Sequence, residues 1–594
     1  MAFDGIVTKA VTTELSALRG ARIDKVFQPN KNEILLGLYL DKKNYAIDIC
    51  IEAQNCRINL TTNSKPNPQV APNFCMLLRK NLIGIKLKNI ITFDLERLVI
   101  LEFEGFDELD DIISKKLVIE LMGKHSNIIL LDDTNIIIDS LRHIKEIDEN
   151  YRDILPHTKY SFPTSDKYSF LELKDFDDFK SHIHSKDIKE IPAEISGIFN
   201  GISKSLISAI IKKLNIDTIT DENLKKIFNY INKILNNIGT DNLSFEKIKN
   251  DVGVEKDYFL IFDNLLSDSI LEDTSSKSLK KANEEPFKLN FLIDDFYFKK
   301  ETSETFKNYR NILLKLILDT LKKYNKRLYH INEKLHECDD MDKYRIYGEL
   351  ITANLYKIPS KNAEEIELEN YYDNNNKILI KLDKRFSPSI NAKRFFKKYS
   401  KLKNALAIVT EQKNDTLKEL DYIESVVYEL ENCSTIDEVA TIYEEISEND
   451  IFKEKTSKTN TTKKSKVKKS KLTKNKEVSF NPIKYTVDGY TVLVGRNNKE
   501  NDYLTLKYAN KTDIWFHTKD FHGSHTILKL DNNLPYPNND ILIKVAQLAA
   551  THSKAKNSSN VPVDYCEVKY VKKPSGSKPG MVSYTNNKTL NVNP

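Results

Sequence analysis

Hydrophobic residues in the middle third of the chain recur at alternating three- and four-residue spacing over two long stretches. The first set is Leu314, Ile317, Leu321, Tyr324, Leu328, Ile331, Leu335 and Cys338; the second, interrupted by polar Lys413 and Thr416, is Tyr399, Leu402, Leu406, Val409, Leu420, Ile423, Val427 and Leu430. This is the a/d pattern of a coiled coil, and each stretch spans roughly 40–50 Å at the helical rise per residue. The intervening segment lacks the repeat and contains Pro359 and Pro388. We therefore expect an antiparallel helical arm with a tip between its helices.

Alternating hydrophobic and polar residues predict a β-rich domain before this arm. A helix is expected at residues 4–19, where Asp4 can cap its start and Gly20 can end it. Strands are expected at residues 33–40, 45–51, 57–60, 90–95, 98–103, 117–121, 127–131 and 136–138, and a second helix at 72–89. For residues 176–265 we predict short helices with polar connections.

The pattern after the arm predicts a separate α+β domain. Residues 484–494 form an expected β-hairpin around Asp488 and Gly489, and helices are expected at 502–509 and 540–553. Residues 453–476 hold eleven lysines and one glutamate and almost no hydrophobic residue, which predicts a disordered linker. The whole chain is thus predicted to be an α+β multidomain protein. Its predicted parts are residues 1–175, 176–265, 266–452 with the tip near 340–390, 453–477 and 478–594.

Composition narrows the class of protein. No stretch approaches 18 uninterrupted apolar residues and the first residues do not resemble a signal peptide, so we expect a cytoplasmic protein without a membrane partner. The six cysteines show no CxxC spacing, which argues against a disulfide framework and a zinc site. The net charge is only +5, so the lysine-rich segment concentrates positive charge locally and indicates a polyanionic partner.

Three polar sites stand out before the arm. Glu96 and Arg97 lie at an expected turn between two strands, where a plain surface ion pair is the better interpretation from the residues alone. Lys124 and His125 interrupt two strands, and a solvated turn explains them equally well. Residues 199–204 resemble a helix-hairpin-helix turn whose N–H groups can receive a phosphate, although an ordinary helical hairpin has the same pattern. Its candidate phosphate contacts are Gly201, Ser203 and Lys204.

The predicted tip combines basic and aromatic residues, a composition suited to phosphates and stacked bases. The candidate contacts there are Arg345, Lys393, Arg394, Lys397 and Lys398. The alternative is that the aromatic residues begin the helical seam while the lysines are a solvated face. That alternative accounts for Phe395 and Tyr399.

Residues 513–525 contain the only tryptophan, Trp515, and three histidines, His517, His522 and His525. A metal site is one interpretation, but no carboxylate has a fixed position beside them. Ser524 and His525 do not form a catalytic pair, because neighbours on a strand point to opposite faces. A polar surface for RNA ranks first and a metal site second. The RNA candidates are Trp515, His517, Lys519, His525, Lys572, Lys573 and Lys578.

Several motifs along the whole chain resemble one known family. They are Met-x-Phe-Asp-Gly at the start, Met-Gly-Lys-His-Ser-Asn, Gly-Glu-Leu-Ile-Thr-Ala-Asn-Leu, Ser-Pro-Ser-x-Asn-Ala-x-Arg-Phe-Phe-Lys-Lys-Tyr, Asp-Ile-Trp-Phe-His with Gly-Ser-His, and Lys-Pro-Ser-Gly-x-Lys-Pro-Gly. Together they are similar to the NFACT family of ribosome-quality-control factors. The resemblance implies an NFACT-N domain similar to DNA-glycosylase N-terminal domains, a helix-hairpin-helix module, a coiled-coil arm and an NFACT-R domain.

The resemblance also implies a function without enzymatic activity or a cofactor. Such factors bind a large ribosomal subunit, through its rRNA and proteins, that still carries peptidyl-tRNA. They recruit alanyl-tRNA so that the ribosome adds an untemplated alanine tail, with a small accessory RNA-binding factor as a further partner and the factor itself a monomer. The family's tRNA-contacting acid-arginine pair corresponds to Glu96 and Arg97, with glutamate where aspartate is common, and Asp4 corresponds to its N-terminal acidic position.

Two other classes remain open from the sequence. One is a surface adhesin that binds fibronectin, which requires export although no export signal is visible. The other is a glycosylase-like nucleic-acid enzyme, which the absence of an N-terminal proline nucleophile after Met1 disfavours.

Overall fold

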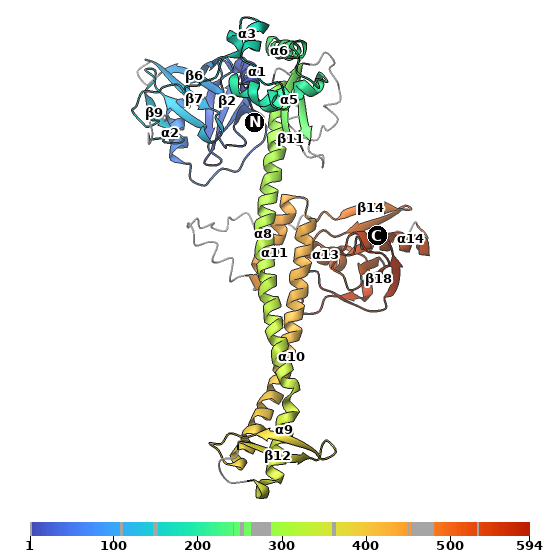
Figure 1. Ribbon diagram of the computed structural model, residues 1–594. Coiled ribbons are helices and arrows are strands. Elements are labelled where there is room, and N and C mark those ends of the chain that lie inside the picture. Colours follow the sequence, from blue (N-terminus) through green and yellow to red (C-terminus); the bar gives the residue numbers. More distant parts are fainter. Residues whose placement is uncertain are drawn as a thin grey trace. The chain divides into compact units, whose positions relative to one another are not determined.

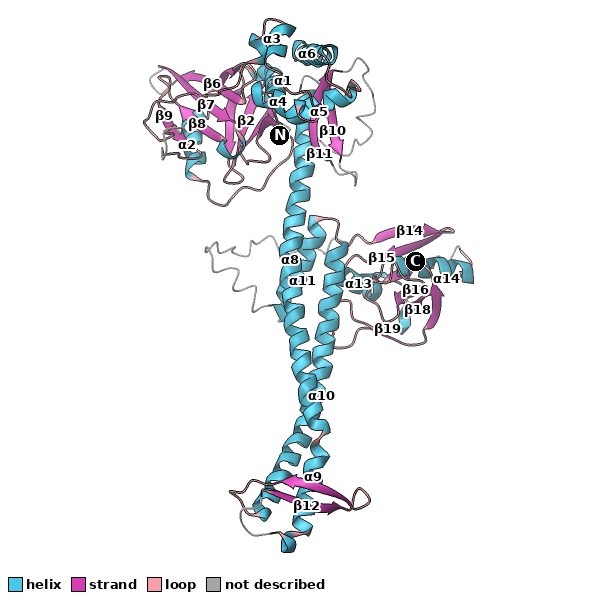
Figure 2. Cartoon of the chain, viewed as in Figure 1, coloured by secondary structure: helices cyan, strands magenta, loops and turns pink. Residues whose placement is uncertain are grey.

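The computed structural model describes residues 3–106, 111–145, 152–240, 243–249, 255–262, 287–358, 364–449, 451–452, 480–530 and 534–594. The chain divides into two compact units, Met1–Ser303 and Glu304–Pro594 (Figure 1). The predicted lysine-rich linker at 453–477 lies outside the described residues. Within the described part, no helix combines the length and apolarity needed to cross a membrane. The predicted α+β multidomain class is confirmed, with a large antiparallel sheet and long helices in Figure 2.

The first unit is built on an antiparallel sheet. Its described strands are β1 (Arg22–Phe27), β2 (Glu33–Leu40), β3 (Lys43–Cys50), β4 (Arg57–Leu60), β5 (Lys86–Thr92), β6 (Leu98–Phe106), β7 (Ile112–Glu120), β8 (Asn127–Leu131) and β9 (Ile137–Ser140). They lie in the order β4-β3-β2-β1-β5-β6-β7-β8-β9. Helices α1 (Gly5–Leu15) and α2 (Asn73–Leu82) contribute Val7, Leu15 and Leu78 to the main core.

In this region one predicted helix was wrong in its boundary and one strand was not predicted. The helix expected at 72–89 ends at Leu82, because Gly84 adopts a positive φ of 93° and the chain then enters β5. Strand β1 was missed because its apolar residues, Ile23, Val26 and Phe27, do not alternate with polar ones, and a bulge between Ile23 and Lys25 accounts for the break.

A helical module follows in the same unit. It comprises α3 (Phe176–Ser181), α4 (Ile191–Ile198), α5 (Lys204–Lys213) and α6 (Asp221–Asn236). These helices share a core that includes Phe170, Phe179 and Phe199, and Ile6 and Leu95 from the sheet domain belong to the same core. The all-helical prediction for 176–265 was wrong at its end, where β10 (Leu243–Lys249) and β11 (Glu255–Phe262) pair as an antiparallel hairpin.

The first turns of α8 (Lys288–Asp339) are anchored in the first unit. The Glu14 carboxylate accepts hydrogen bonds from the backbone N–H groups of Leu289 and Asn290, at 2.9 and 3.0 Å. These are two of the N–H groups that a helix start leaves without an internal partner. Further along the helix, Glu301 pairs with buried Arg57 at 2.7 Å.

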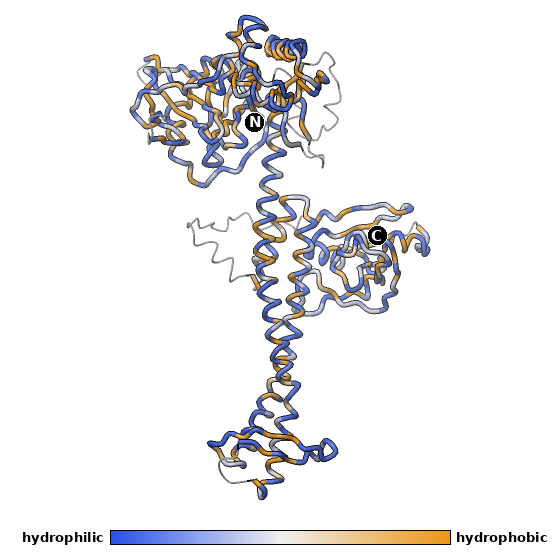
Figure 3. Tube along the Cα trace, viewed as in Figure 1, coloured by the Kyte–Doolittle hydropathy of each residue, from blue (hydrophilic) through white to orange (hydrophobic). Residues whose placement is uncertain are grey.

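The second unit contains the rest of α8 and the predicted return helix, α10 (Pro388–Asn432). Arg310 Nε donates to the Leu430 carbonyl at 2.8 Å, and Arg327 pairs with Glu419 at 3.5 Å, so the two helices run antiparallel. Ile317 and Ile423 are fully buried between them. Both helices mix hydrophobic and hydrophilic residues along their length in Figure 3. Between them lie α9 (Met341–Ala353) and the hairpin of β12 (Glu365–Asn370) and β13 (Asn376–Lys381). Helix α11 (Ile436–Glu448) follows α10.

The C-terminal part of this unit is a sheet with helices on both faces. Its described strands are β14 (Ile483–Val487), β15 (Tyr490–Val494), β16 (Ile514–Thr518), β17 (Thr526–Leu528), β18 (Val561–Glu567) and β21 (Lys588–Val592), in the order β14-β15-β17-β16-β18-β21. Helix α14 (Asn539–Thr551) packs against one face, and Leu504 packs with Trp515 on the other. The helix expected at 502–509 is instead α13 (Asn498–Tyr503), which continues as a π-helix at Leu504–Tyr508.

Candidate nucleic-acid interface

Segments that are far apart in the sequence meet at the start of α1. The backbone N–H of Gly5 donates to the carbonyl of Gly201 at 2.9 Å. A Cβ atom on Gly5 would lie 1.8 Å from the Leu95 carbonyl oxygen, and one on Gly201 would lie 2.0 Å from the same oxygen. Gly201 also has a φ of +70°, which glycine adopts readily. Glycine is therefore required at both positions for the hairpin between α4 and α5 to dock on the sheet domain.

The buried Asp4 side chain stabilises this junction through hydrogen bonds at the starts of α1 and α5. Its Oδ1 accepts from the Val7 N–H at 3.0 Å and caps α1, while its Oδ2 accepts from the Ser203 hydroxyl at 2.6 Å. Ser203 Oγ in turn accepts from the Leu206 N–H at 3.3 Å and caps α5. Burial raises the pKa of Asp4, and the Ser203 and Val7 hydrogen bonds and the charge of Arg97 oppose that rise.

Two predicted contacts are corrected by this arrangement. The Asp4 side chain is only 6% exposed, so it is a buried helix cap and does not contact tRNA directly. The Ser203 hydroxyl is committed to three internal hydrogen bonds, to Asp4, Leu206 and Ser205, which leaves the half-buried Gly201 backbone and the exposed Lys204 at the hairpin surface.

Glu96 and Arg97 lie directly beside the hairpin. Glu96 Oε1 accepts a hydrogen bond from Asn200 Nδ2. Burial raises the pKa of Glu96, against the Asn200 hydrogen bond and the charges of Arg97 and Lys167. The carboxylate thus holds the hairpin, which a plain surface ion pair does not do. Sequence analysis missed Asn200, although its place just before Gly201 in the turn was visible.

The turn that carries Lys124 and His125 adjoins Arg97. The Leu121 N–H donates to the Arg97 carbonyl at 2.8 Å, and the next residues form a 3-10 turn at Gly123–His125. Lys124 and His125 are exposed as predicted. Arg142, which sequence analysis missed, fixes the turn by donating to the carbonyl oxygens of Lys124 at 3.2 Å and Ser126 at 3.0 Å. This end of the sheet presents basic groups from separate segments on a rigid backbone.

At the tip, most predicted cations have internal partners. Arg345 pairs with Asp342 and Glu349, each at 3.2 Å, and Arg394 pairs with Asp383 at 2.9 Å. Lys398 Nζ donates to the Tyr344 hydroxyl at 2.7 Å. These side chains shape the tip, since they already have partners.

Two predicted lysines at the tip remain open. Lys393 and Lys397 are exposed and pair with no carboxylate among the described residues. Phe395 packs half-buried against Tyr344 and Tyr347, which confirms the alternative interpretation for that residue. Sequence analysis missed Tyr356, which is 80% exposed.

The tryptophan and histidine stretch is mostly interior. Trp515 is fully buried and His525 is 2% exposed, so the predicted direct RNA contact by these two side chains was wrong. His525 Nδ1 hydrogen-bonds to Thr505 Oγ1 at 2.8 Å, and burial lowers the pKa of His525 to about 3. His517 stacks parallel to Trp515 with ring centroids 5.7 Å apart. Trp515 and His517 lie on the same face of β16, and Leu504 covers Trp515 on that face.

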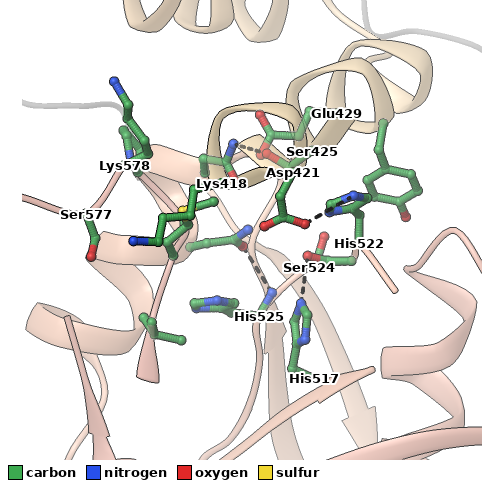
Figure 4. A pocket seen from close by; sticks show the side chains of 18 of the residues that line it. Lys418, Asp421, Ser425, Glu429, His517, His522, Ser524, His525, Ser577 and Lys578 are labelled. Atoms are coloured by element: carbon green, nitrogen blue, oxygen red, sulfur yellow. Dashed lines mark hydrogen bonds and ion pairs between the residues drawn. The ribbon is translucent and has the colours of Figure 1, made fainter. Parts of the chain in front are cut away.

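His517 and His525 line a pocket of about 900 Å³ between α10 and the C-terminal sheet (Figure 4). Its acidic lining residues are Asp415, Glu419, Asp421, Glu429 and Asp520, against the lysines Lys418 and Lys578. His522 lies 3.7 Å from Asp421 and 3.5 Å from Glu424 on α10. Burial raises the pKa of Glu429, with the neighbouring Glu445 adding to the rise. The lining is more acidic than basic and does not suit a phosphate.

The lysines of the predicted basic turn after β18 differ in whether they have internal partners. Lys573 pairs with Asp502, and Lys578 donates to Asn449 Oδ1 at 2.7 Å, so both hold the domain together. Lys519 and Lys572 are exposed. Within the described ranges, no three histidine, cysteine or carboxylate side chains are grouped closely enough to hold a metal ion.

Comparisons with known proteins account for the whole chain. Residues 4–466 match the model of the NFACT N-terminal and middle domains, and residues 476–586 match the NFACT protein RNA binding domain. The Rqc2 homolog RqcH of Bacillus subtilis (strain 168) is 32% identical over 605 residues, covering 100% of this chain and 98% of the relative. The Rqc2 homolog RqcH of Streptococcus suis (strain 05ZYH33) is 31% identical over 607 residues, with the same coverage.

Solved structures also match parts of the chain. The C-terminal structure of the fibronectin/fibrinogen-binding protein from Streptococcus suis is 31% identical and covers 49% of this chain and 95% of its own, with a TM-score of 0.35. The N-terminal structure of that protein is 26% identical and covers 50% and 99%, with a TM-score of 0.38. The full-length sequence matches, together with the two domain models, show that this chain belongs to the NFACT family.

Proposed function

We propose that the protein is a ribosome-associated quality-control factor that performs no chemistry of its own. In this proposal it binds an obstructed large (50S) subunit that carries peptidyl-tRNA and recruits alanyl-tRNA. The peptidyl-transferase centre of the subunit then adds an untemplated C-terminal alanine tail, which marks the stalled chain for degradation. The protein acts in the cytoplasm as a monomer on the subunit, with a small accessory RNA-binding factor as a further partner.

The main support is that three separate segments of the chain bring basic groups together at the end of the large sheet. Glu96 fixes the hairpin through Asn200, and Arg97 and the turn with Lys124 lie beside it, so basic groups are held by the backbone of three segments. Pre-organised cations suit the phosphates and base edges of a folded RNA. The relatives named Rqc2 homolog RqcH and the match to an RNA-binding domain agree with this assignment.

Co-purification tests the proposal as a whole. The tagged protein is isolated from its own cells, and the bound RNA and proteins are sequenced. We expect large-subunit rRNA with one dominant tRNA and no small-subunit rRNA. Recovery of neither RNA would refute the proposal, and binding to immobilised fibronectin in that case would favour the adhesin class.

Replacing Arg97 tests the tRNA surface separately. Arg97→Ala is expected to weaken tRNA binding by about 1–3 kcal/mol, roughly five- to 150-fold, because a guanidinium fork on base edges or phosphate is lost. Co-sedimentation with large subunits should persist. The matched control is Arg22→Ala, since Arg22 is a surface arginine of the same sheet paired with Asp24. Equal tRNA affinity in Arg97→Ala and Arg22→Ala would contradict the assigned role.

A further inference from the structure

An exposed aromatic group lies on the C-terminal domain, outside the lining of the acidic pocket. Phe480 sits between Tyr503 and Tyr508, with ring centroids 4.9 and 4.7 Å away. Tyr503 is 37% and Tyr508 is 47% exposed, and Leu506 between them is 41% exposed. Large apolar side chains grouped on a surface mark interaction sites more often than single ones do.

The π-helix at Leu504–Tyr508 presents these rings. The Ala509 N–H donates to the Leu504 carbonyl at 2.9 Å, a wider turn than an α-helix makes. Leu504 and Thr505 point into the domain, where Thr505 bonds His525, while the next residues face outward. Such π-helical turns are rare and frequent at functional sites. The buried histidine therefore supports the exposed face from beneath.

Lysines flank the rings. Lys507 Nζ lies 5.8 Å from the Tyr503 ring centre, and Lys529 Nζ lies 5.4 Å from the Tyr508 ring centre. Buried Asp513 holds Lys529 in place at 2.5 Å. Lys511 is exposed next to this group and has no carboxylate partner in the described part of the chain. The face thus combines ring surfaces with positive charge, in contrast to the acidic pocket.

We propose that this aromatic face, Phe480, Tyr503 and Tyr508 with Lys507 and Lys511, binds unpaired bases of single-stranded RNA. The tyrosine rings stack on successive bases, and the lysines contact the phosphates between them. Neither contact reads a particular base, so the face tolerates many sequences. The inference rests on the proposed RNA-binding function and gives its C-terminal domain a defined contact surface.

The test measures binding of a fluorescein-labelled, unstructured RNA of about 12 nucleotides to the full chain by fluorescence anisotropy. All proteins carry Arg97→Ala, so that the N-terminal surface contributes little. Tyr503→Leu with Tyr508→Leu should weaken binding at least about tenfold, since each lost stack is substantial. Tyr503→Phe with Tyr508→Phe should retain the affinity, because the rings remain. The matched control is Tyr536→Leu, which removes a tyrosine of the same domain that is 69% exposed.

The salt dependence of RNA binding tests the lysines of the aromatic face. Lys507→Gln with Lys511→Gln should reduce the slope of log affinity against log salt concentration by roughly 0.7 for each phosphate that these lysines neutralise on a single strand. Unchanged affinity in the leucine pair, with melting temperature equal to that of the parent, would overturn the proposal.

Cross-linking separates this inference from the proposed function. The full chain bound to large subunits is irradiated, and the peptides joined to RNA are identified. We expect cross-links at 503–508. Cross-links of this face to a ribosomal protein would overturn the RNA assignment while the subunit role stands. Failure of the unsubstituted chain to bind subunits would refute the proposed function instead.

Discussion

Replacing Gly201 with alanine tests whether the junction near Arg97 depends on glycine. The change adds a Cβ atom 2.0 Å from the Leu95 carbonyl oxygen and forces a side chain into a φ of +70°. The left-handed backbone costs alanine about 1–2 kcal/mol, and overlap with backbone that cannot rotate away costs about 1–3 kcal/mol more. We expect the hairpin to lose about 2–5 kcal/mol of local stability.

Alanine substitutions at three other glycines separate the two causes of the lost stability, which are the positive φ and the steric overlap. A Cβ atom added to Gly5 would overlap the Leu95 oxygen, but Gly5 does not have a positive φ. Gly20 shows the opposite combination, with a φ of +86° and open space where a Cβ atom would lie. Gly197 in α4 has neither problem. Gly20→Ala should therefore cost only about 1–2 kcal/mol, and Gly197→Ala should stabilise α4 by about 0.5–1 kcal/mol.

Hydrogen exchange of peptides from α4 and α5 measures this local stability in the full chain. Gly201→Ala should speed their exchange by roughly 30-fold or more, because opening of the docked hairpin becomes cheaper by the stated free energy. Binding of tRNA should fall as well, since Asn200 then no longer holds Glu96. Exchange as slow as in Gly197→Ala would show that the hairpin does not dock through this glycine, and the reasoning would fail.

Two further predictions concern buried charge. Arg57→Ala should destabilise the first unit by about 3–5 kcal/mol in calorimetry, because Asp48 and Glu301, both 2.7 Å from the guanidinium, lose their arginine partner and keep only Lys65; a loss below about 1 kcal/mol would contradict this. Asp4→Asn should change how stability varies with pH. The folded pKa of Asp4 is raised above 3.8, so the folded protein holds this proton more tightly and its stability falls as pH rises from about 4 through the folded pKa. The Asp4→Asn variant does not lose stability in this way, so its free energy of unfolding relative to the parent should improve as the pH rises from about 4 through the folded pKa of Asp4. A difference between variant and parent that stays constant from about pH 4 to 7 would refute the assignment.

The long helices could be predicted from sequence because they depend on local spacing. Heptad positions such as Ile317 and Ile423 mark a seam wherever the partner helix lies, and they are buried in α8 and α10. Strand boundaries were less accurate where a bulge or a positive φ interrupts the pattern, as at Lys25 and Gly84.

The sequence by itself determined the family, the long helices and the presence of Glu96 and Arg97 at a turn. Only the tertiary structure decided that Asn200 reaches Glu96, because sheet pairing and the docked hairpin bring together residues about a hundred positions apart. It also decided that Trp515 is interior while Tyr508 is exposed. Alternation along a strand or helix separates one face from the other, but what covers each face depends on distant segments of the chain.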